Sequence, residues 1–417
     1  MNAPMGSSGH GHLERHSGDR PGSLMTPFAP LFRGMVDRLD GGLDYGSIEA
    51  ILPDGTRRML GGRAPGPDAA IDLRSWRALL RLVTGGSSGW YIAWTKGEWA
   101  SPDPVQLFAV FGRNRATLAA GARASGIALL AKRFAHWLRR NHRAGSRRNI
   151  EYHYDLGNDF YAEWLDPSMT YSSAIFADPG QSLEAAQAAK LEAMLARTAT
   201  RAGDTILEIG CGWGPFAEFA ARAGRKVHGV TLSREQKAYA EGRMAGQDLG
   251  GVDIAITDYR DITGTYDAVV SIEMVEAVGQ DYWPHYLAAI AGALKPGGRA
   301  AIQYISFDDA LFDAYASNVD FIQTYIFPGG MLLSESRFRA IAAAEGLSWQ
   351  DRVTFGAGYA ETLRQWRANF DAAVAAGRMP QQFDRKFIDL WRYYLMYCEG
   401  GFRGGGIDVA QVTLVKE

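Results

Sequence analysis

Apolar and polar positions follow two different rhythms along the second half of the chain. Short apolar runs, typical of buried strands, are separated by longer stretches in which apolar residues recur at helical spacing. The predicted strands are residues 205–209, 226–230, 266–271, 299–304 and 407–415. The predicted helices are residues 214–223, 233–245 and 282–294. This alternation predicts an α/β fold, a doubly wound Rossmann-like domain with a mainly parallel sheet.

The first part of the chain has a mixed pattern, which predicts a smaller α+β domain. The run that begins at Ile48 is typical of a strand that ends in a turn, and residues 75–82 have helical spacing. The aromatic segment 89–99 is predicted to form a strand and a turn. The predicted parts of the chain are a disordered tail at 1–22, an N-terminal accessory domain at 23–125, a junction at 126–149 and a main domain at 150–417.

A basic amphipathic helix is predicted at the junction. Its seven basic residues have no acid between them: Lys132, Arg133, Arg139, Arg140, Arg143, Arg147 and Arg148. One interpretation is a solvated helix packed between domains. The other is docking on anionic lipid headgroups, where each basic residue contributes roughly 1 kcal/mol. The net charge of the chain is −2, so attraction to anions must come from such a patch. No nucleic-acid motif accompanies it, and no nucleic acid is predicted as a partner.

Composition narrows the class of protein. The 417 residues are 47% hydrophobic and 22% charged, as expected for a globular protein with two domains. The two cysteines, Cys211 and Cys398, exclude a disulfide scaffold and a four-cysteine zinc site, and no metal is predicted. No apolar run reaches the ~18–20 residues of a membrane span, and the tail lacks the apolar core of a signal peptide. We expect a cytoplasmic protein that would reach a lipid from the membrane surface.

The strongest local signal is the segment Leu207-Glu-Ile-Gly-Cys-Gly-Trp-Gly-Pro-Phe, between a predicted strand and a predicted helix. Gly210, Gly212 and Gly214 allow the backbone to approach a ligand at the carboxyl edge of the sheet. Their G-x-G-x-G spacing differs from the dinucleotide fingerprint G-x-G-x-x-G. The segment resembles the methyltransferase loop that holds S-adenosylmethionine, in which Glu208 would take the ligand's ammonium group or organise the loop.

Residues after the next two strands complete the predicted nucleoside site. Thr231, Ser233 and Gln236 offer neutral hydrogen bonds where many such enzymes place an acid for the ribose. Ser233 also fits the N-cap of the next helix, with Gln236 closing a capping box, and both interpretations can hold together. After the third strand, Asp258-Tyr-Arg-Asp offers an aromatic ring and an acid for an adenine edge. The predicted cofactor-binding residues are Tyr154, Tyr171, Ser172, Glu208, Gly210, Gly212, Trp213, Gly214, Thr231, Leu232, Ser233, Gln236, Tyr259 and Arg260.

Further motifs in a fixed order show a resemblance to one family. Besides Trp213 and the Thr-Leu-Ser-x-x-Gln segment, they are His153-Tyr-Asp-Leu-Gly-Asn-Asp-Phe-Tyr, Glu273-Met-Val-Glu-Ala-Val-Gly, Asp320-Phe-Ile-Gln-Thr-Tyr-Ile-Phe-Pro-Gly-Gly, Tyr359-Ala-Glu-Thr-Leu-Arg-Gln-Trp and Tyr397-Cys-Glu-Gly-Gly-Phe-Arg. From about residue 150 to residue 416 the chain resembles the cyclopropane-fatty-acyl-phospholipid synthases, which include the mycolic acid cyclopropane synthases. The N-terminal domain is similar to the family's extra domain more loosely. The resemblance implies a class I methyltransferase fold that uses S-adenosylmethionine.

The resemblance also implies a mechanism. A cis alkene attacks the sulfonium methyl group, and a base then removes a proton from the new methyl group of the resulting carbocation, so that a ring closes. The protein orients the reactants, excludes water and stabilises the transient positive charge. In the family the base is a bound bicarbonate, whose ligands in this chain would be Glu276, Tyr359 and the backbone of Ile305.

The chain departs from the family at three of the implied bicarbonate positions. Ser173 stands for a cysteine, and Gln303 and Ala277 each stand for a histidine. Serine and glutamine still donate hydrogen bonds, so an anion could be held. Cys398 matches a cysteine that could be a nucleophile, but the chemistry needs no covalent adduct and a structural role is preferred. Glu273 shares a loop with the family glutamate, as half of a carboxylate pair or as a surface residue.

The predicted function is transfer of a methyl(ene) group from S-adenosylmethionine to the cis double bond of an unsaturated phospholipid acyl chain, giving a cyclopropane fatty acid. Aromatic faces suit a cation in an apolar tunnel, although any one such residue more often belongs to the core. The candidates are Tyr304, Phe307, Phe321, Tyr325, Phe327, Trp391 and Tyr394. The expected partners are the acyl chain and the anionic inner face of the membrane, and the extra domain could mediate a homodimer.

Three alternatives remain open. With the same donor and lipid but a misplaced base, the product would be a methyl-branched or methylene fatty acid without a ring. A methyltransferase for a soluble metabolite is disfavoured by the basic junction and the aromatic-rich second half. A non-catalytic lipid- or nucleoside-binding protein is disfavoured by the intact glycine loop, Glu276 and Tyr359.

Overall fold

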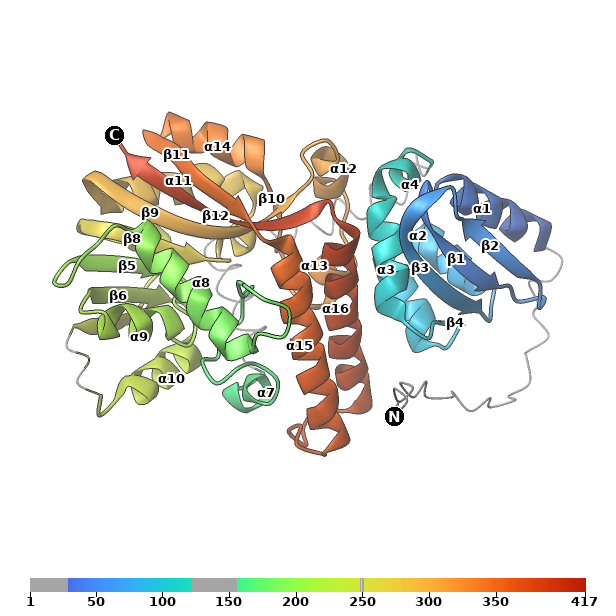
Figure 1. Cartoon of the computed structure of the whole chain (residues 1–417), viewed down its shortest axis with the longest axis horizontal. Helices are drawn as coiled ribbons and strands as arrows, with labels where there is room; N and C mark the ends of the chain where they lie inside the picture. Colours follow the sequence, from blue (N-terminus) through green and yellow to red (C-terminus); the bar gives the residue numbers. More distant parts are fainter. Residues whose placement is uncertain (1–28, 122–155, 248, 250) are drawn as a thin grey trace, which may run out of the picture.

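The described chain contains one large and one small sheet, each accompanied by helices (Figure 1). This computed structural model describes residues 29–121, 156–247, 249 and 251–417. The predicted tail at 1–22 and the predicted basic junction at 126–149 therefore lie outside the described residues.

The large sheet has the predicted doubly wound arrangement. Within the described residues its strand order is β11-β12-β9-β8-β5-β6-β7, with β10 beside β9. Strands β5 to β9 pair in parallel, and β12 runs antiparallel to both β9 and β11. The strands are β5 (Thr205–Ile209), β6 (Lys226–Thr231), β7 (Val252–Ile256), β8 (Tyr266–Ile272), β9 (Leu294–Phe307), β10 (Leu333–Ser334), β11 (Leu347–Thr354) and β12 (Ile407–Lys416).

The helices of this larger part follow the predicted alternation. The α-helices are α7 (Asn158–Ala162), α8 (Leu183–Arg197), α9 (Pro215–Arg222), α10 (Arg234–Met244), α11 (Trp283–Ala293), α12 (Phe312–Ala316), α13 (Phe321–Tyr325), α14 (Glu335–Ala344), α15 (Gly356–Ala375) and α16 (Arg385–Gly404). The 3-10 helices are η2 (Tyr259–Asp261), η3 (Val275–Ala277) and η4 (Gln280–Tyr282). Each of the predicted strands and helices of this part overlaps an observed element, and the predicted α/β fold is confirmed.

The central strand β5 explains why the sheet is covered on both faces. Ile206 packs in one cluster with Phe216 of α9 and with residues of α8. Leu207 and Ile209 belong to a second cluster that includes Tyr286 of α11. Because neighbouring residues of a strand point to opposite faces, this apolar run needs helices on both sides.

The N-terminal part forms the small sheet, in the order β2-β1-β3-β4. Its strands are β1 (Tyr45–Ile51), β2 (Arg57–Gly61), β3 (Ala64–Leu73) and β4 (Trp99–Ala100). Its helices are α1 (Ala29–Gly41), α2 (Arg77–Thr95), α3 (Pro104–Arg113) and α4 (Arg115–Gly121). The run that begins at Ile48 lies in β1, which pairs antiparallel with β2 after a turn, and the helix predicted at residues 75–82 is the start of α2.

The strand predicted within residues 89–99 is wrong. Residues 89–95 continue α2, and of this segment only Trp99 enters a strand. Trp90 stacks on Trp99 with ring centroids 4.7 Å apart, and Tyr91 packs on Tyr393 of α16 at 5.0 Å. These tertiary contacts outweigh the β-propensity of the aromatic residues, which is a weak and context-dependent preference.

Helices α3 and α16 join the two parts and run side by side (Figure 1). Gly400 of α16 lets them approach closely, because a Cβ there would lie 2.4 Å from Cβ of Phe108 and 2.6 Å from the carbonyl of Val105. The hydroxyl groups of Ser88 and Thr324 add a hydrogen bond of 3.0 Å between the two parts. The N-terminal part is thus held against α16 through α3.

We expect Gly400→Ala to lower the free energy of unfolding by about 1–3 kcal/mol, because the added methyl group overpacks the α3–α16 contact. Gly401→Ala is the matched control on the same helix, since its Cβ would meet only the flexible end of Ile407 at 3.2 Å. Urea unfolding of both variants measures the difference. Equal stability of the two variants would contradict the assigned contact.

Candidate active site

A cavity of about 1750 Å³ lies against the glycine loop and the segment that follows β8, and reaches the N-terminal part. Ten of the fourteen predicted cofactor-binding residues line it: Tyr171, Ser172, Glu208, Gly210, Gly212, Trp213, Thr231, Leu232, Gln236 and Tyr259. Gly214, Ser233 and Arg260 are not among its lining residues, and Tyr154 lies outside the described residues. The cavity is therefore where the predicted nucleoside site and the rest of the candidate chemistry meet.

The glycine loop has a backbone that only glycine adopts readily. Gly210, Gly212 and Gly214 have φ values of +81°, +53° and +84°. A Cβ at Gly210 would lie 2.8 Å from Cγ of Met274, whereas Gly214 is the N-cap residue of α9 and packs on Ala240. Gly210 and Gly212 thus open the backbone to the cavity, and Gly214 serves the packing of α9.

Glu208 provides the acidic group of this loop. It is buried in the cavity wall, and its Oε2 has no hydrogen-bond partner among the described residues. Burial raises the pKa of Glu208 to about 8, although the charge of Lys190 acts in the opposite direction. An unpaired acidic oxygen next to a glycine loop fits the ammonium group of S-adenosylmethionine.

The polar residues at the end of β6 and just after it bond mainly to one another. Ser233 caps α10, since its Oγ accepts from the backbone N–H of Gln236 at 3.2 Å. The side chain of Gln236 does not close the expected capping box, because its Oε1 accepts from the hydroxyl of Thr231 at 3.0 Å. Arg260 forms an ion pair of 2.6 Å with Asp258 and does not reach into the cavity.

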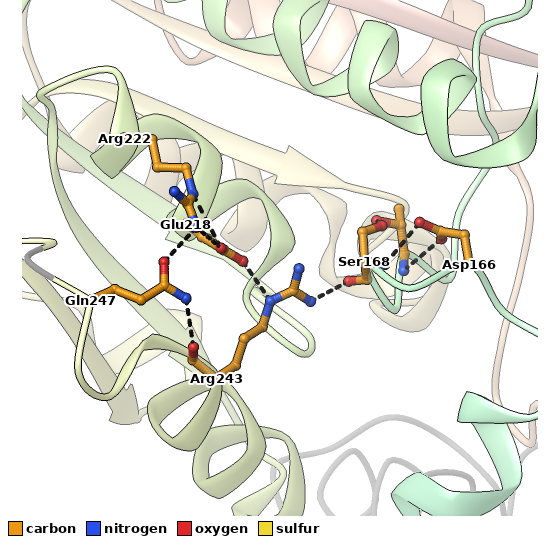
Figure 2. Close-up of polar contacts among 7 residues, drawn as sticks. Asp166, Ser168, Glu218, Arg222, Arg243 and Gln247 are labelled. Carbon is orange, nitrogen blue, oxygen red and sulfur yellow. Dashed lines mark hydrogen bonds and ion pairs between the residues drawn. The ribbon is translucent and has the colours of Figure 1, made fainter.

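A polar network holds Asp166 and Ser168 (Figure 2), just before Tyr171, Ser172 and Ser173 in the chain. Arg243 of α10 donates to the carbonyl of Ser168 at 2.6 Å and pairs with Glu218 of α9. Glu218 also holds Arg222, as Figure 2 shows. The carboxylate of Asp166 accepts from the backbone N–H of Ser168 at 2.9 Å. The segment is therefore anchored to the same helices that carry the nucleoside site.

Glu273, in the cavity wall just after β8, collects three hydrogen-bond donors. Its Oε1 accepts from the backbone N–H of Ser173 at 2.8 Å and from Nε2 of Gln303 at 2.8 Å. Its Oε2 accepts from the hydroxyl of Tyr359 at 2.7 Å. These donors are three of the residues that the resemblance implied for a bound bicarbonate. In this chain they already hold a carboxylate of the protein itself.

Glu276 lies in the same wall but accepts fewer hydrogen bonds than Glu273. Its Oε1 accepts from the backbone N–H of Ile305, and its Oε2 has no partner among the described residues. Burial, and next the charge of Glu273, raise the pKa of Glu276 to about 8. Burial also raises the pKa of Glu273, but the hydrogen bonds that it accepts act against this. Near neutral pH we therefore assign the negative charge to Glu273 and the proton to Glu276.

The backbone of Glu273 is strained. Its φ is +50°, in the left-handed region that residues with a side chain seldom adopt. Such a conformation costs of order 1–3 kcal/mol and is typical of functional sites. Sequence reasoning named Glu273 only as a possible partner of the family glutamate. The signal was the pair of glutamates three residues apart, directly after a predicted strand.

Lys190 is a functional candidate that sequence reasoning missed. It lies on α8, is completely buried and lines the cavity, where its Nζ donates to Oγ of Ser172 at 2.7 Å. Burial lowers the pKa of Lys190 to about 8, against the charges of Glu273, Asp166 and Glu208. The available signal was its place on a helix face between Ala186 and Met194, both buried.

The remaining candidates divide between cavity and core. Cys398 lines the cavity, and burial raises the pKa of its thiol, which keeps it neutral and fits the preferred structural role. Of the tunnel aromatics, Phe307, Phe327 and Tyr394 line the cavity. The others do not, and they pack within the protein: Tyr304, Phe321, Tyr325 and Trp391.

Comparison with known proteins agrees with this geometry. Residues 141–412 match the mycolic acid cyclopropane synthetase family. The chain is 38% identical over 361 residues to the tuberculostearic acid methyltransferase UfaA1 of Mycobacterium tuberculosis, covering 81% of each protein. It is 37% identical over 266 residues to the cyclopropane-fatty-acyl-phospholipid synthase of Escherichia coli, covering 63% of this chain and 66% of that one. The mycolic acid cyclopropane synthase CmaA1, complexed with SAH and CTAB, superposes with a TM-score of 0.61 and 29% identity over 65% of this chain and 98% of its own.

The fold and the glycine loop define a class I methyltransferase that uses S-adenosylmethionine. The chain belongs to the mycolic acid cyclopropane synthetase family, and its family modifies fatty-acyl lipids. The predicted class of enzyme and the predicted cofactor are confirmed.

The charge assignment predicts a pH effect on stability. The folded-state pKa of Glu276, about 8, exceeds its ordinary value of 4.5, so between these pH values the folded state binds more protons there than the unfolded chain. Its contribution to stability therefore falls as pH rises. We expect Glu276→Gln to gain stability relative to the parent over this window, by at most about 1.4 kcal/mol per pH unit.

Urea unfolding of parent and variant at several pH values measures this gain. Glu192→Gln, at an exposed position of α8, is the control and should show a smaller trend. A difference between Glu276→Gln and the parent that stays constant with pH would refute the assignment of the proton to Glu276.

Proposed function

We propose that the chain transfers the methyl carbon of S-adenosylmethionine to the cis double bond of an unsaturated acyl chain carried by a membrane phospholipid. The observation that carries this proposal is the extent of the cavity. It runs from Glu208 and the glycine loop, past Glu273 and Glu276, to apolar side chains of the N-terminal part such as Leu82 and Phe111. Its volume of about 1750 Å³ exceeds the ~300–1,000 Å³ of ordinary small-molecule pockets.

Different residues of the chain would bind the cofactor, orient the acyl chain and stabilise the positive charge. Glu208, Gly210 and Gly212 would hold S-adenosylmethionine, which supplies an electrophilic methyl group when bound. The apolar wall would orient the acyl chain and exclude water. The rings of Phe327 and Tyr394, which lie in the cavity wall 6.2 Å apart, would stabilise positive charge on the acyl chain.

The lipid would enter beside α2. Val83 lines the cavity and is 67% exposed, and Leu80 on the same helix is also exposed. An apolar rim on a cavity that reaches the surface suits the withdrawal of an acyl chain from a bilayer. Within the described residues, no helix has both the length and the apolar character needed to cross a membrane. From the apolar rim we propose peripheral binding, at the cytoplasmic face of the membrane.

Val83→Asp should weaken binding to phospholipid vesicles and lower turnover on vesicle substrate by about tenfold or more, because a charge at the rim opposes contact with the acyl region. Met59→Asp is the matched control, since Met59 is 62% exposed on β2 but does not line the cavity. Vesicle flotation and product formation are measured for both variants, with S-adenosylhomocysteine affinity as a folding check. Equal losses in both variants would argue against entry beside α2.

A product without a ring is a second candidate. The residues that match the implied bicarbonate site differ at Ser173, Gln303 and Ala277. In addition, the relative that aligns over 81% of the chain is named a tuberculostearic acid methyltransferase and not a cyclopropane synthase. A methylene fatty acid would require the same donor and olefin, with a hydride shift before the transferred carbon loses its proton. A methyl-branched alkene would instead require proton loss from a carbon of the acyl chain.

Expression of the chain in a host that lacks such lipids tests the proposal. We expect new phospholipid acyl groups that are heavier by one CH2 unit, identified by mass spectrometry of their methyl esters. Proton NMR of the purified esters separates ring protons from vinylic protons. Absence of new acyl species in cells that contain folded, cofactor-binding protein would overturn the assignment of phospholipid as acceptor.

A further inference from the structure

We propose that the carboxylate of Glu273 is the chain's own base for the final proton transfer and takes the place of an exchangeable anion such as bicarbonate. The inference rests on the proposed function for the identity of the proton donor. Its structural part, the occupation of the anion position by Glu273, stands independently of the lipid.

The protein's own carboxylates use the donors that the resemblance implied for a bound bicarbonate. The backbone N–H of Ser173, Nε2 of Gln303 and the hydroxyl of Tyr359 converge on its two oxygens at 2.7–2.8 Å. The backbone N–H of Ile305, the fourth implied ligand, is taken by Glu276. The residues present therefore do not fit a bound bicarbonate, because the protein's own carboxylates occupy the donors assigned to it.

The charges around Glu273 also argue against a bound bicarbonate. Glu276 lines the cavity beside it, and Lys190 is the buried cation whose charge acts on Glu273. A bicarbonate would add another negative charge to two buried carboxyl groups. Burying an anion without a partner is costly, whereas Glu273 is already ordered and already bonded.

The proton transfer balances without an external co-reactant. The alkene's π electrons form the first carbon–carbon bond as the carbon–sulfur bond breaks and its electron pair leaves on the sulfur. A C–H bond of the transferred carbon then breaks, and its electron pair closes the ring or, after a hydride shift, forms a methylene double bond. The proton passes to the Glu273 carboxylate, which Tyr359 and Gln303 orient, and later leaves to solvent.

Equilibrium dialysis with labelled bicarbonate tests the structural part. It is done with S-adenosylhomocysteine present and lipid absent. The parent protein should bind no bicarbonate above background. Glu273→Gly should bind about one equivalent, because it vacates the carboxylate position and a glycine suits the φ of +50°. Saturable binding by the parent, or no binding by a Glu273→Gly protein that still binds S-adenosylhomocysteine, would overturn the proposal.

Measurements of turnover test whether Glu273 is the base. Parent activity should be unchanged in carbonate-free buffer. Glu273→Gln should lose about 100-fold or more in kcat with nearly unchanged S-adenosylhomocysteine affinity. Glu276→Gln should lose less, about tenfold, because its amide replaces an acid that already carries a proton. A larger loss in Glu276→Gln, or a parent that needs bicarbonate, would show that Glu273 is not the base.

These readouts separate the two proposals. If phospholipid is not the acceptor, no variant forms lipid product, yet the dialysis result for parent and Glu273→Gly is unaffected. If Glu273 does not replace the anion, the lipid product still forms and the parent binds bicarbonate.

Discussion

Negative charge buried at the carboxyl edge of the large sheet is the constraint on which the rest of the structure depends. Glu208, Glu273 and Glu276 are all withdrawn from water in one cavity wall, with Lys190 as the buried cation. A buried carboxylate persists only where hydrogen bonds or opposite charge offset its lost hydration. The three sites differ: Glu273 accepts three hydrogen bonds, Glu276 keeps its proton, and Glu208 keeps one buried oxygen without a hydrogen-bond partner among the described residues.

The fold supplies these donors from segments far apart in the chain. Ser173 lies 100 residues before Glu273, and Tyr359 lies 86 residues after it. The parallel sheet brings the ends of β5, β8 and β9 to one edge, while α15 carries Tyr359 against them. The polar network of Arg243 and Glu218 ties the segment before Ser173 to the nucleoside helices. The cofactor loop and the acidic site are thus parts of one cavity wall.

Much of the larger part could be predicted from the sequence, because its strands and helices are strongly periodic and its glycine loop has a distinctive spacing. The continuation of α2 through Trp90 and Tyr91 could not be predicted, because it depends on the packing of these rings against Trp99 and Tyr393 and not on local propensity. The role of Glu273 could not be predicted from the sequence either. A glutamate beside another glutamate has no distinctive pattern until three distant donors are seen to converge on it.

A base that is part of the chain places a permanent negative charge in the site. An exchangeable anion can leave when the cofactor's positive charge is absent, whereas Glu273 cannot, so its charge must be held in every state of the cycle. The strained backbone at φ +50° and the three donors are the structural means. Glu276 then limits the total charge by retaining its proton. The departures at Ser173, Gln303 and Ala277 follow from the same cause, because a wall that already contains its carboxylate no longer needs the side chains that hold a free one.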